Sequence, residues 1–373
     1  MSDSPTETPP SAPVVRPGIL DIAPYVGGES KVPGANRIIK LASNESALGP
    51  SPKAIEALKA HAGTMHRYPD GNAIELRQTL ARHFGLDAER ILVGNGSDEL
   101  ISLLVRAYAG PGDEVLYSRH GFLMYAISAK TVGATPVDAP ERDFTADVDA
   151  LLAAVTERTK LVFLANPNNP TGTCLPASEV RRLHAGLPPH VILGIDAAYA
   201  EFVEGEDYDP GIELVLASEN TVMLRTFSKL YALGGMRVGW AFCPPGIADA
   251  LNRLRGPFNV GAAAQAAALA SLEDVEHARR SLAHNRKWRD WSTAEFTRLG
   301  LTVIPSQGNF LLVRFPDAAA RNADAGFEFL KSHGIIARKM GAYHLGHSLR
   351  ITIGTEEEMR LTAAALADFL RSS

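Results

Sequence analysis

Apolar residues in the middle of the chain gather in short unbroken runs that do not alternate with polar positions. These runs predict five strands, at 91–93, 114–117, 160–165, 191–195 and 221–226. Unbroken runs are typical of parallel strands, because helices cover both faces of a parallel sheet. Between them lie segments with helical spacing, such as 98–109, where Leu100, Leu103 and Leu104 share one face. This alternation predicts a doubly wound α/β sheet.

The two ends of the chain break this pattern. Residues 1–17 are rich in Pro, Ser and Thr and have too few apolar residues to form a core, so we predict a flexible tail. From about Val275, helical segments alternate with predicted strands at 309–313 and 349–353, which indicates a smaller α+β domain. A length of 373 residues fits a large domain with a smaller partner.

Composition narrows the class of protein. The net charge of −5 argues against nucleic-acid binding as the main role, because such proteins usually carry a basic surface. Cys174 and Cys243 are far apart and fit two buried thiols, with no metal site or disulfide expected. The small-apolar stretch 261–272 is too short to span a bilayer and predicts a close-packed helix. The N-terminus lacks the apolar run of a signal peptide, so we expect a cytoplasmic protein without a membrane partner.

Polar residues follow three of the predicted strands directly. The segment 166–172 (Asn-Pro-Asn-Asn-Pro-Thr-Gly) follows the first, and Asp196 follows the second, with Tyr199 three residues on. Thr226, Ser228 and Lys229 follow the third. In open parallel sheets the ligand crevice lies outside the carboxyl ends of the strands. We therefore expect an amide, a carboxylate and an amine to meet there, which is the combination that a pyridoxal 5′-phosphate (PLP) site needs.

Lys229 is the candidate for covalent attachment of that cofactor. A lysine that forms a Schiff base must be neutral part of the time, which burial near other cations promotes. Thr226, Ser228 and Arg237 flank it and can hold a phosphate through charge-assisted hydrogen bonds. The alternative is a surface lysine beside a glycine turn, but Arg237 downstream and Asp196 upstream favour the functional interpretation.

Asp196 ends an apolar strand, where an unpaired carboxylate is costly. The pyridinium nitrogen of PLP would be a cationic partner for it. The alternative is a helix N-cap, a position that Asp also suits, although capping does not account for Tyr199.

The segment 94–99 (Gly-Asn-Gly-Ser-Asp-Glu) predicts a loop that opens a helix, where free N–H groups and the helix dipole attract a phosphate. It does not match the dinucleotide motif G-x-G-x-x-G, because position 99 is Glu.

Taken together, these motifs resemble fold-type I PLP aminotransferases, and most closely the histidinol-phosphate aminotransferase branch. The resemblance covers nearly the whole chain after the tail. The segments that carry it are 22–25, 41–52, 66–70, 94–100, 166–172, 196–202, 225–239 and 348–355. Among them, Pro24-Tyr25, Arg67-Tyr68-Pro69 and the 349–355 segment Leu-Arg-Ile-Thr-Ile-Gly-Thr point to this branch.

The resemblance implies a set of cofactor-binding residues. Lys229 forms the Schiff base and acts as the acid and base of the proton shift, Asp196 pairs with the pyridinium nitrogen, and Asn169 and Tyr199 bind the phenolic oxygen. Phe122 stacks on the pyridine ring. The residues implied at the phosphate are Ser97, Asp98, Thr226, Ser228 and Arg237, together with Tyr68 from the neighbouring subunit of a homodimer with shared active sites.

The resemblance also implies the substrate site and the reaction. Tyr25, Asn44, Arg338 and Arg350 bind small-molecule substrates. The reaction implied moves an amino group between L-histidinol phosphate and 2-oxoglutarate, with imidazole acetol phosphate and L-glutamate as the other pair, in L-histidine biosynthesis. A planar guanidinium can bind a phosphate or a carboxylate bidentately, so the two arginines suit both half-reactions.

The implied fold is aspartate-aminotransferase-like, with a large PLP-binding domain of mostly parallel strands covered by helices and a smaller α+β domain. The implied division is a tail (1–17), an N-terminal arm and small-domain segment (18–52), the large domain (53–274) and the small C-terminal domain (275–373).

This sequence departs from the family pattern at two places and leaves other functions open. Asn44-Glu-Ser-Ala replaces the usual Asn-Glu-Asn-Pro, and Phe122 stands where a tyrosine is often found. An aromatic amino-acid aminotransferase and a phosphothreonine-type decarboxylase are the alternatives on the same fold. A PLP-sensing regulator would need a DNA-binding domain, for which the stretch before Asp21 is too short. An α/β protein that binds no PLP is the remaining alternative.

Overall fold

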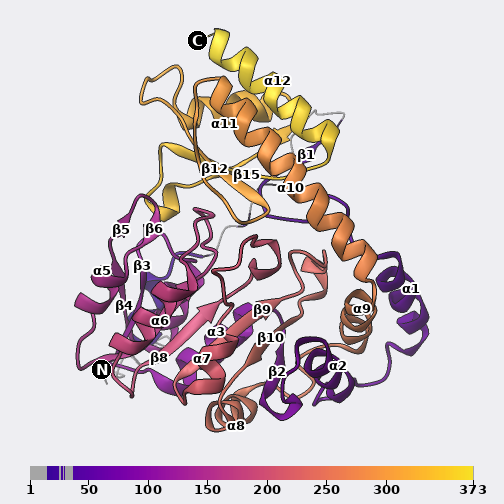
Figure 1. Cartoon of the computed structure of the whole chain (residues 1–373), viewed down its shortest axis with the longest axis vertical. Helices are drawn as coiled ribbons and strands as arrows, with labels where there is room; N and C mark the ends of the chain where they lie inside the picture. The colour runs from indigo at the N-terminus through magenta and orange to yellow at the C-terminus, as the bar shows by residue number, and fades with distance from the viewer. Residues whose placement is uncertain (1–14, 25–26, 28, 30–36, 373) are drawn as a thin grey trace, which may run out of the picture.

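The structure is a computed structural model that describes residues 15–24, 27, 29 and 37–372. The predicted tail therefore lies almost entirely outside the described residues, and the predicted substrate residue Tyr25 lies wholly outside them. Two sheets organise the rest of the chain, a larger one in the broad lower part of Figure 1 and a smaller one in the narrow upper part.

The larger sheet has seven strands. In spatial order they are β2 (Ile91–Gly94), β10 (Gly239–Phe242), β9 (Thr221–Thr226), β8 (Ile192–Asp196), β7 (Thr159–Ala165), β3 (Glu114–Ser118) and β4 (Thr135–Ala139). Only β10 runs antiparallel to its neighbours. The predicted α/β fold with a mostly parallel sheet is thus confirmed, and each of the five predicted runs forms a strand.

The sequence did not predict β4 and β10. The edge strand β4 contains a proline and has only its last residue buried, and β10 spans four residues that begin with glycine. β4 lacks the unbroken apolar run by which the other strands were found, whereas β10 has a short one that follows the loop around Lys229 directly.

Side chains of the central strands alternate between two apolar cores. On β7, Leu161 and Phe163 face the core under α3 (Ser97–Tyr108), α4 (Met124–Val132) and α8 (Pro245–Leu254). Val162 and Leu164 face the opposite core. The helices of that core are α1 (Pro52–His61), α2 (Ile74–Phe84), α5 (Val148–Ala153), α6 (Ala177–Gly186), α7 (Ile212–Ala217) and α9 (Ala262–Glu273). Both faces are covered, which accounts for the unbroken apolar runs.

The alanine-rich stretch forms the expected close-packed helix. In α9, Ala264, Ala267 and Ala268 are buried, and the helix packs closely against α1. Among the described residues, no helix combines the length and apolar character needed to cross a membrane. Cys174 and Cys243 are both free thiols, with Cys243 buried and Cys174 only partly so.

The smaller sheet is antiparallel and has its own core. Its strands, in order, are β11 (Thr302–Ile304), β12 (Phe310–Arg314), β15 (Ser348–Thr352) and β14 (Arg338–Lys339), and its helices are α10 (Val275–Arg298), α11 (Ala323–Ser332) and α12 (Glu356–Ser372). β1 (Ile39–Lys40) pairs with β13 (Ile335–Ile336), so a segment from before residue 52 joins the C-terminal core. The core of the smaller sheet is separate from the two cores that cover the larger sheet. This separation supports the division at residues 52 and 274, which we retain as a proposal.

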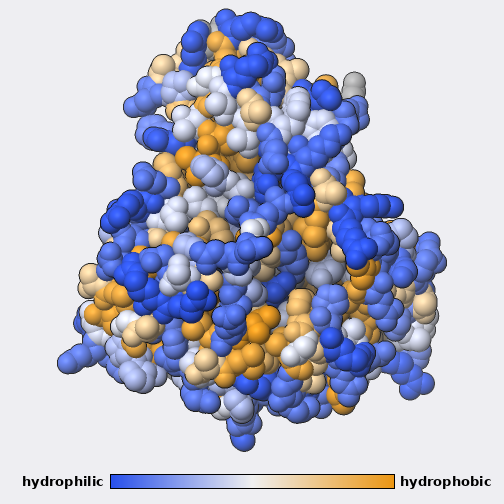
Figure 2. Space-filling view, in the orientation of Figure 1, coloured by the Kyte–Doolittle hydropathy of each residue, from blue (hydrophilic) through white to orange (hydrophobic). Residues whose placement is uncertain are grey.

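A short hairpin of β5 (Glu141–Arg142) and β6 (Thr145–Ala146) completes the described strands. Figure 2 shows that hydrophilic residues predominate on the viewed face, with apolar residues in scattered groups, as is usual for a protein surface.

Candidate active site

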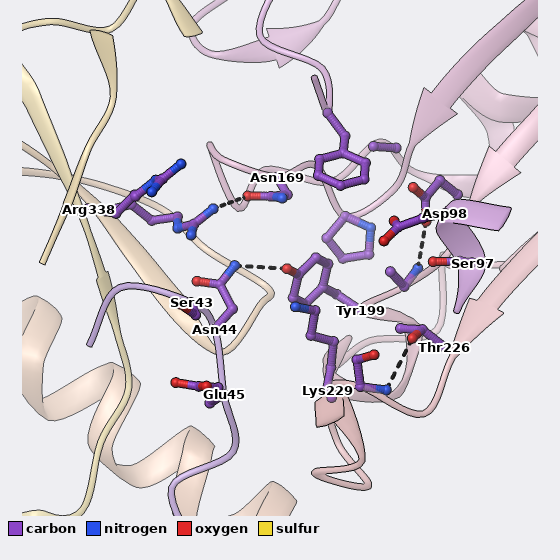
Figure 3. Close-up of a pocket in the computed structure, with 18 of the residues that line it drawn as sticks. Ser43, Asn44, Glu45, Ser97, Asp98, Asn169, Tyr199, Thr226, Lys229 and Arg338 are labelled. Atoms are coloured by element: carbon purple, nitrogen blue, oxygen red, sulfur yellow. Dashed lines mark hydrogen bonds between the residues drawn. The ribbon is translucent and has the colours of Figure 1, made fainter. Parts of the chain in front are cut away.

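A cavity of about 350 Å³ opens at the carboxyl ends of β7, β8 and β9, between the part of the chain built on the larger sheet and the part built on the smaller sheet. All the residues predicted for the site line it, apart from Tyr68 and the undescribed Tyr25. Figure 3 shows how they converge, with Arg338 from the smaller sheet opposite Asp98, Thr226 and Lys229 from the larger one. The three strand ends therefore supply one cavity, as the sequence predicted.

Lys229 follows β9 in a tight loop. Phe227 N–H bonds Val238 O at 3.0 Å and Leu233 N–H bonds Phe227 O at 3.0 Å, which fixes the path of the chain around the lysine. Lys229 Nζ lies 5.6 Å from the centroid of the Tyr199 ring. The lysine thus extends into the cavity beside the tyrosine (Figure 3).

Asp196 lies at the end of β8 and is only 6% exposed. Its Oδ2 accepts a hydrogen bond of 2.7 Å from the hydroxyl of Tyr125, and its Oδ1 accepts the Ala198 N–H at 3.3 Å. Burial, as the largest cause, raises the pKa of Asp196 to about 6. A cation placed beside this carboxylate would therefore stabilise its ionised form.

The structure contradicts the alternative role of Asp196 as a helix N-cap. The next helical turn, Ala200–Phe202, has Tyr199 at its N-cap position, and no side chain caps it. Sequence reasoning also missed Tyr125, because nothing in the local pattern around it indicates a partner on β8.

The start of α3 forms an anion-binding cradle. Its N-cap is Gly96, whose φ of 78° suits glycine, and a Cβ there would lie 2.3 Å from Arg237 Nη2. Arg237 Nη2 donates to Asp98 Oδ2 at 2.9 Å, and Nη1 donates to Ser228 Oγ at 3.4 Å. Backbone N–H groups, a guanidinium and hydroxyl groups thus surround a space suited to a phosphate.

That cradle depends on a close approach between β10 and α3. A Cβ at Gly239, the first residue of β10, would lie 2.3 Å from the backbone nitrogen of Ser97. Only glycine therefore allows the two elements to pack with the first turn of α3 facing the cavity.

Two arginines approach the cavity from the smaller sheet. Arg338 and Arg350 are direct register partners on β14 and β15, so their side chains leave the sheet on the same face. Arg350 Nη1 donates to Asn169 Oδ1 at 2.5 Å, and Nη2 donates to Ala42 O at 2.8 Å. The amide predicted from the first strand end is therefore in direct contact with an arginine from the other core.

Asn44 links the same two cores. Its side-chain nitrogen donates to the hydroxyl of Tyr199 at 2.8 Å, and its backbone N–H donates to Thr352 Oγ1 at 2.9 Å. Its φ of 54° is left-handed, a conformation that asparagine tolerates better than most residues. Burial is the largest cause that raises the pKa of Tyr199, to about 12.

Tyr68 lies outside the cavity. Its side chain is 83% exposed and stacks on Phe258 with ring centroids 4.7 Å apart. An aromatic pair held in this way at the surface is suited to a contact with another molecule. The role predicted for Tyr68 in a neighbouring subunit stays a prediction.

The chain is similar to known proteins over nearly its whole length. The family model of aminotransferase class I and II matches residues 36–366. A histidinol-phosphate aminotransferase of Paramagnetospirillum magneticum is 63% identical over 360 residues, which cover 96% of this chain and 99% of that protein. One from Rhodospirillum centenum is 59% identical over 97% of this chain and 99% of its own length.

A solved structure is also similar over nearly the full length. It is histidinol-phosphate aminotransferase from Sinorhizobium meliloti in complex with pyridoxal-5′-phosphate, with a TM-score of 0.89 and 32% sequence identity. The match covers 97% of this chain and 99% of that one.

The raised pKa of Asp196 predicts a pH-dependent stability of the ligand-free protein. In the folded state the pKa is about 6, against an ordinary value of 3.8, so the native protein holds this proton more tightly than the unfolded chain does. The contribution of Asp196 to the free energy of unfolding should therefore fall as pH rises from about 4 to about 6, by at most about 3 kcal/mol. Urea unfolding at several pH values measures it.

The control is Asp196→Asn, which has no titrating group at this position. The difference in unfolding free energy between the two proteins should change with pH across this window and level off above it. A difference that stays constant from pH 4 to 7 would contradict the prediction.

Proposed function

The chain belongs to the class I and II aminotransferases, and we propose that it uses PLP to transfer the amino group of L-histidinol phosphate to 2-oxoglutarate. The observation that carries this proposal is the meeting of Lys229, Asp196 and an anion cradle in one cavity that two arginines enter from the opposite side. The two relatives named above, both histidinol-phosphate aminotransferases, support this substrate and a step in L-histidine biosynthesis. The cytoplasmic location stays a prediction.

The residues of the cavity fit PLP on three separate points. The first turn of α3, Arg237 and Ser228 offer donors to its phosphate. The buried carboxylate of Asp196 needs a cation, and the protonated ring nitrogen of PLP is one. Lys229 supplies the amine that binds PLP covalently. When bound, PLP supplies an electron sink that stabilises negative charge on the substrate carbon next to the amine.

The remaining cavity residues have supporting roles in this proposal. Lys229 Nζ would take the proton from that carbon as a general base and deliver it, as a general acid, to the carbon that was the aldehyde carbon of PLP. Tyr199 and Asn169 would donate hydrogen bonds to the phenolic oxygen of PLP, and Phe122 would cover one face of its ring. Since Phe122 has no hydroxyl, it would contribute packing alone.

The two arginines account for two chemically different substrates. The donor carries a phosphate and lacks an α-carboxylate, whereas the acceptor carries two carboxylates. A guanidinium binds either group through two parallel hydrogen bonds. Arg350, held by Asn169 and Ala42, would be the fixed anion site, with Arg338 beside it on the next strand.

We further propose that two copies of the chain share their active sites through Tyr68. The support is the exposure of Tyr68 and its stacking on Phe258, which is itself 44% exposed. A tyrosine placed in this way cannot serve the cavity of its own chain, but its hydroxyl is available to a phosphate in a second copy.

A paired-substrate assay tests the proposed reaction. With 2-oxoglutarate as acceptor, purified holoenzyme should turn over L-histidinol phosphate with a kcat/KM at least about a hundredfold above that for L-phenylalanine, because the phenyl ring of L-phenylalanine carries no anion for the arginines where histidinol phosphate carries its phosphate. Coupled detection of glutamate measures both rates. Equal or reversed rates would instead identify an aromatic amino-acid aminotransferase, and release of carbon dioxide would identify a decarboxylase.

Arg350→Ala tests the shared anion site. Loss of a bidentate guanidinium should raise KM for both L-histidinol phosphate and 2-oxoglutarate by about tenfold or more, while PLP stays bound, since Arg350 lies on the substrate side of Asn169. Single-turnover kinetics of each half-reaction and the absorbance of the bound cofactor measure the two effects. If only one half-reaction weakened, the two anions would not share this site.

A hybrid dimer tests the proposed role of Tyr68. Lys229→Ala and Tyr68→Ala chains, co-expressed with different affinity tags, should form a hybrid with one complete site, since each chain supplies what the other lacks. Its activity should approach about half that of the wild-type dimer. The matched control joins Lys229→Ala with Asp196→Asn, two changes that leave both sites defective and should restore nothing. A Lys229→Ala and Tyr68→Ala hybrid no more active than the Tyr68→Ala homodimer would refute shared sites.

A further inference from the structure

Tyr125 is a buried polar residue that the proposed reaction does not use directly. It lies in the first turn of α4, has no exposed surface and is absent from the lining of the cavity. Its hydroxyl nevertheless donates to Asp196 Oδ2 at 2.7 Å. It therefore contacts the carboxylate from outside the lining of the cavity.

The position of this hydroxyl is fixed by ring packing. The Tyr125 ring lies parallel to Phe163 of β7, with an interplanar angle of 4° and centroids 4.7 Å apart. Phe122 meets the same ring edge-on, at 89° and 6.0 Å. Because Phe122 lines the cavity, one buried ring supports both the carboxylate and the aromatic wall of the site.

The direction of the hydrogen bond is also fixed. Burial, as the largest cause, and the nearby Asp196 raise the pKa of Tyr125 well above its ordinary value. The phenol therefore remains a donor throughout the pH range in which Asp196 titrates.

Several groups act on Asp196 from the elements around it. Asp98 at the start of α3 raises the pKa of Asp196, whereas Lys229 and the Ala198 N–H lower it. Among the influences that lower it, the hydrogen bond from Tyr125 is the largest. Without that bond the carboxylate would have a single weak donor, the Ala198 N–H at 3.3 Å.

We propose that Tyr125 is a positioning residue that acts through Asp196, holding the carboxylate in one orientation and in its ionised form, so that it retains a proton on the ring nitrogen of the cofactor. This inference rests on the proposed function. A carboxylate that loses a buried donor becomes more basic and competes for the shared proton, which weakens the ring as an electron sink.

Tyr125→Phe tests the proposal, because it removes the hydroxyl and leaves the ring that packs on Phe163 and Phe122. In the holoenzyme without substrate, the pH midpoint at which the visible band of the Lys229-linked cofactor changes should rise by about one unit. The value of kcat for the amino donor should fall about tenfold or more, with KM little changed. A midpoint identical to that of the wild type would overturn the proposal.

A second readout needs no cofactor. In the ligand-free protein, Tyr125→Phe should extend the pH-dependent fall in stability to higher pH, because Asp196 then holds its proton more tightly. In the Asp196→Asn background the same substitution should produce no pH-dependent change. A protein that failed to bind PLP would refute the proposed function, while this measurement would still decide whether Tyr125 holds Asp196 in its ionised form.

Tyr117→Phe is the matched control. Tyr117 is a half-buried tyrosine whose ring lies 6.1 Å from that of Tyr125, and no hydrogen bond joins it to Asp196. The Tyr117→Phe variant should leave the spectral midpoint unchanged, so equal shifts in both variants would indicate a packing effect and overturn the proposal.

Incorporation of 3-fluorotyrosine at position 125 provides a stronger hydrogen-bond donor. This change should lower the spectral midpoint, and an upward shift would also contradict the proposal.

Discussion

The carboxylate of Asp196 lies at the buried end of β8, where it has little contact with solvent, and the surrounding structure compensates for that burial only in part. A phenol and a weak backbone contact are its hydrogen-bond donors, and its pKa stays raised. The ligand-free fold therefore holds an electrostatic cost at the centre of the cavity, which a cation removes. A cationic ring that binds beside Asp196 therefore stabilises the folded state through the same interaction that gives the ring its affinity.

The architecture determines where such a site can form. Parallel strands place their carboxyl ends at one edge, so three sequence segments far apart in the chain reach one cavity with short loops. The sequence could predict the segment 166–172, Asp196 and Lys229 together for this reason, since each lies at or just past the end of an apolar run, while the resemblance singled out Asn169 within that segment. Gly96 and Gly239 complete the arrangement, because their lack of side chains lets Arg237 and β10 approach the first turn of α3.

Other parts of the site could not be derived from local pattern. Arg338 and Arg350 belong to a second sheet, and only the resemblance to a known family connected them with the cavity. Tyr125 meets Asp196 across 71 positions of sequence, and its buried ring looks like an ordinary core residue. The strand β4 was missed because its apolar run is interrupted, and β10 because its short apolar run follows the loop around Lys229 directly. Local periodicity identifies elements, but contacts between distant elements require the packing itself.

Hydrogen bonds cross the cavity between the larger-sheet side and the smaller-sheet side. Asn44 joins Tyr199 to Thr352, and Arg350 joins Asn169 to the backbone of Ala42, so Tyr199 and Asn169 on the larger-sheet side are hydrogen-bonded to the side where Arg350 lies. Arg350 contacts the oxygen of the Asn169 amide, so the nitrogen of that amide stays available as a donor while the guanidinium is held in place. A change at one side of the cavity would reach the other side through this contact. Such coupling requires a direct hydrogen-bonded path between the cores, which these four contacts supply.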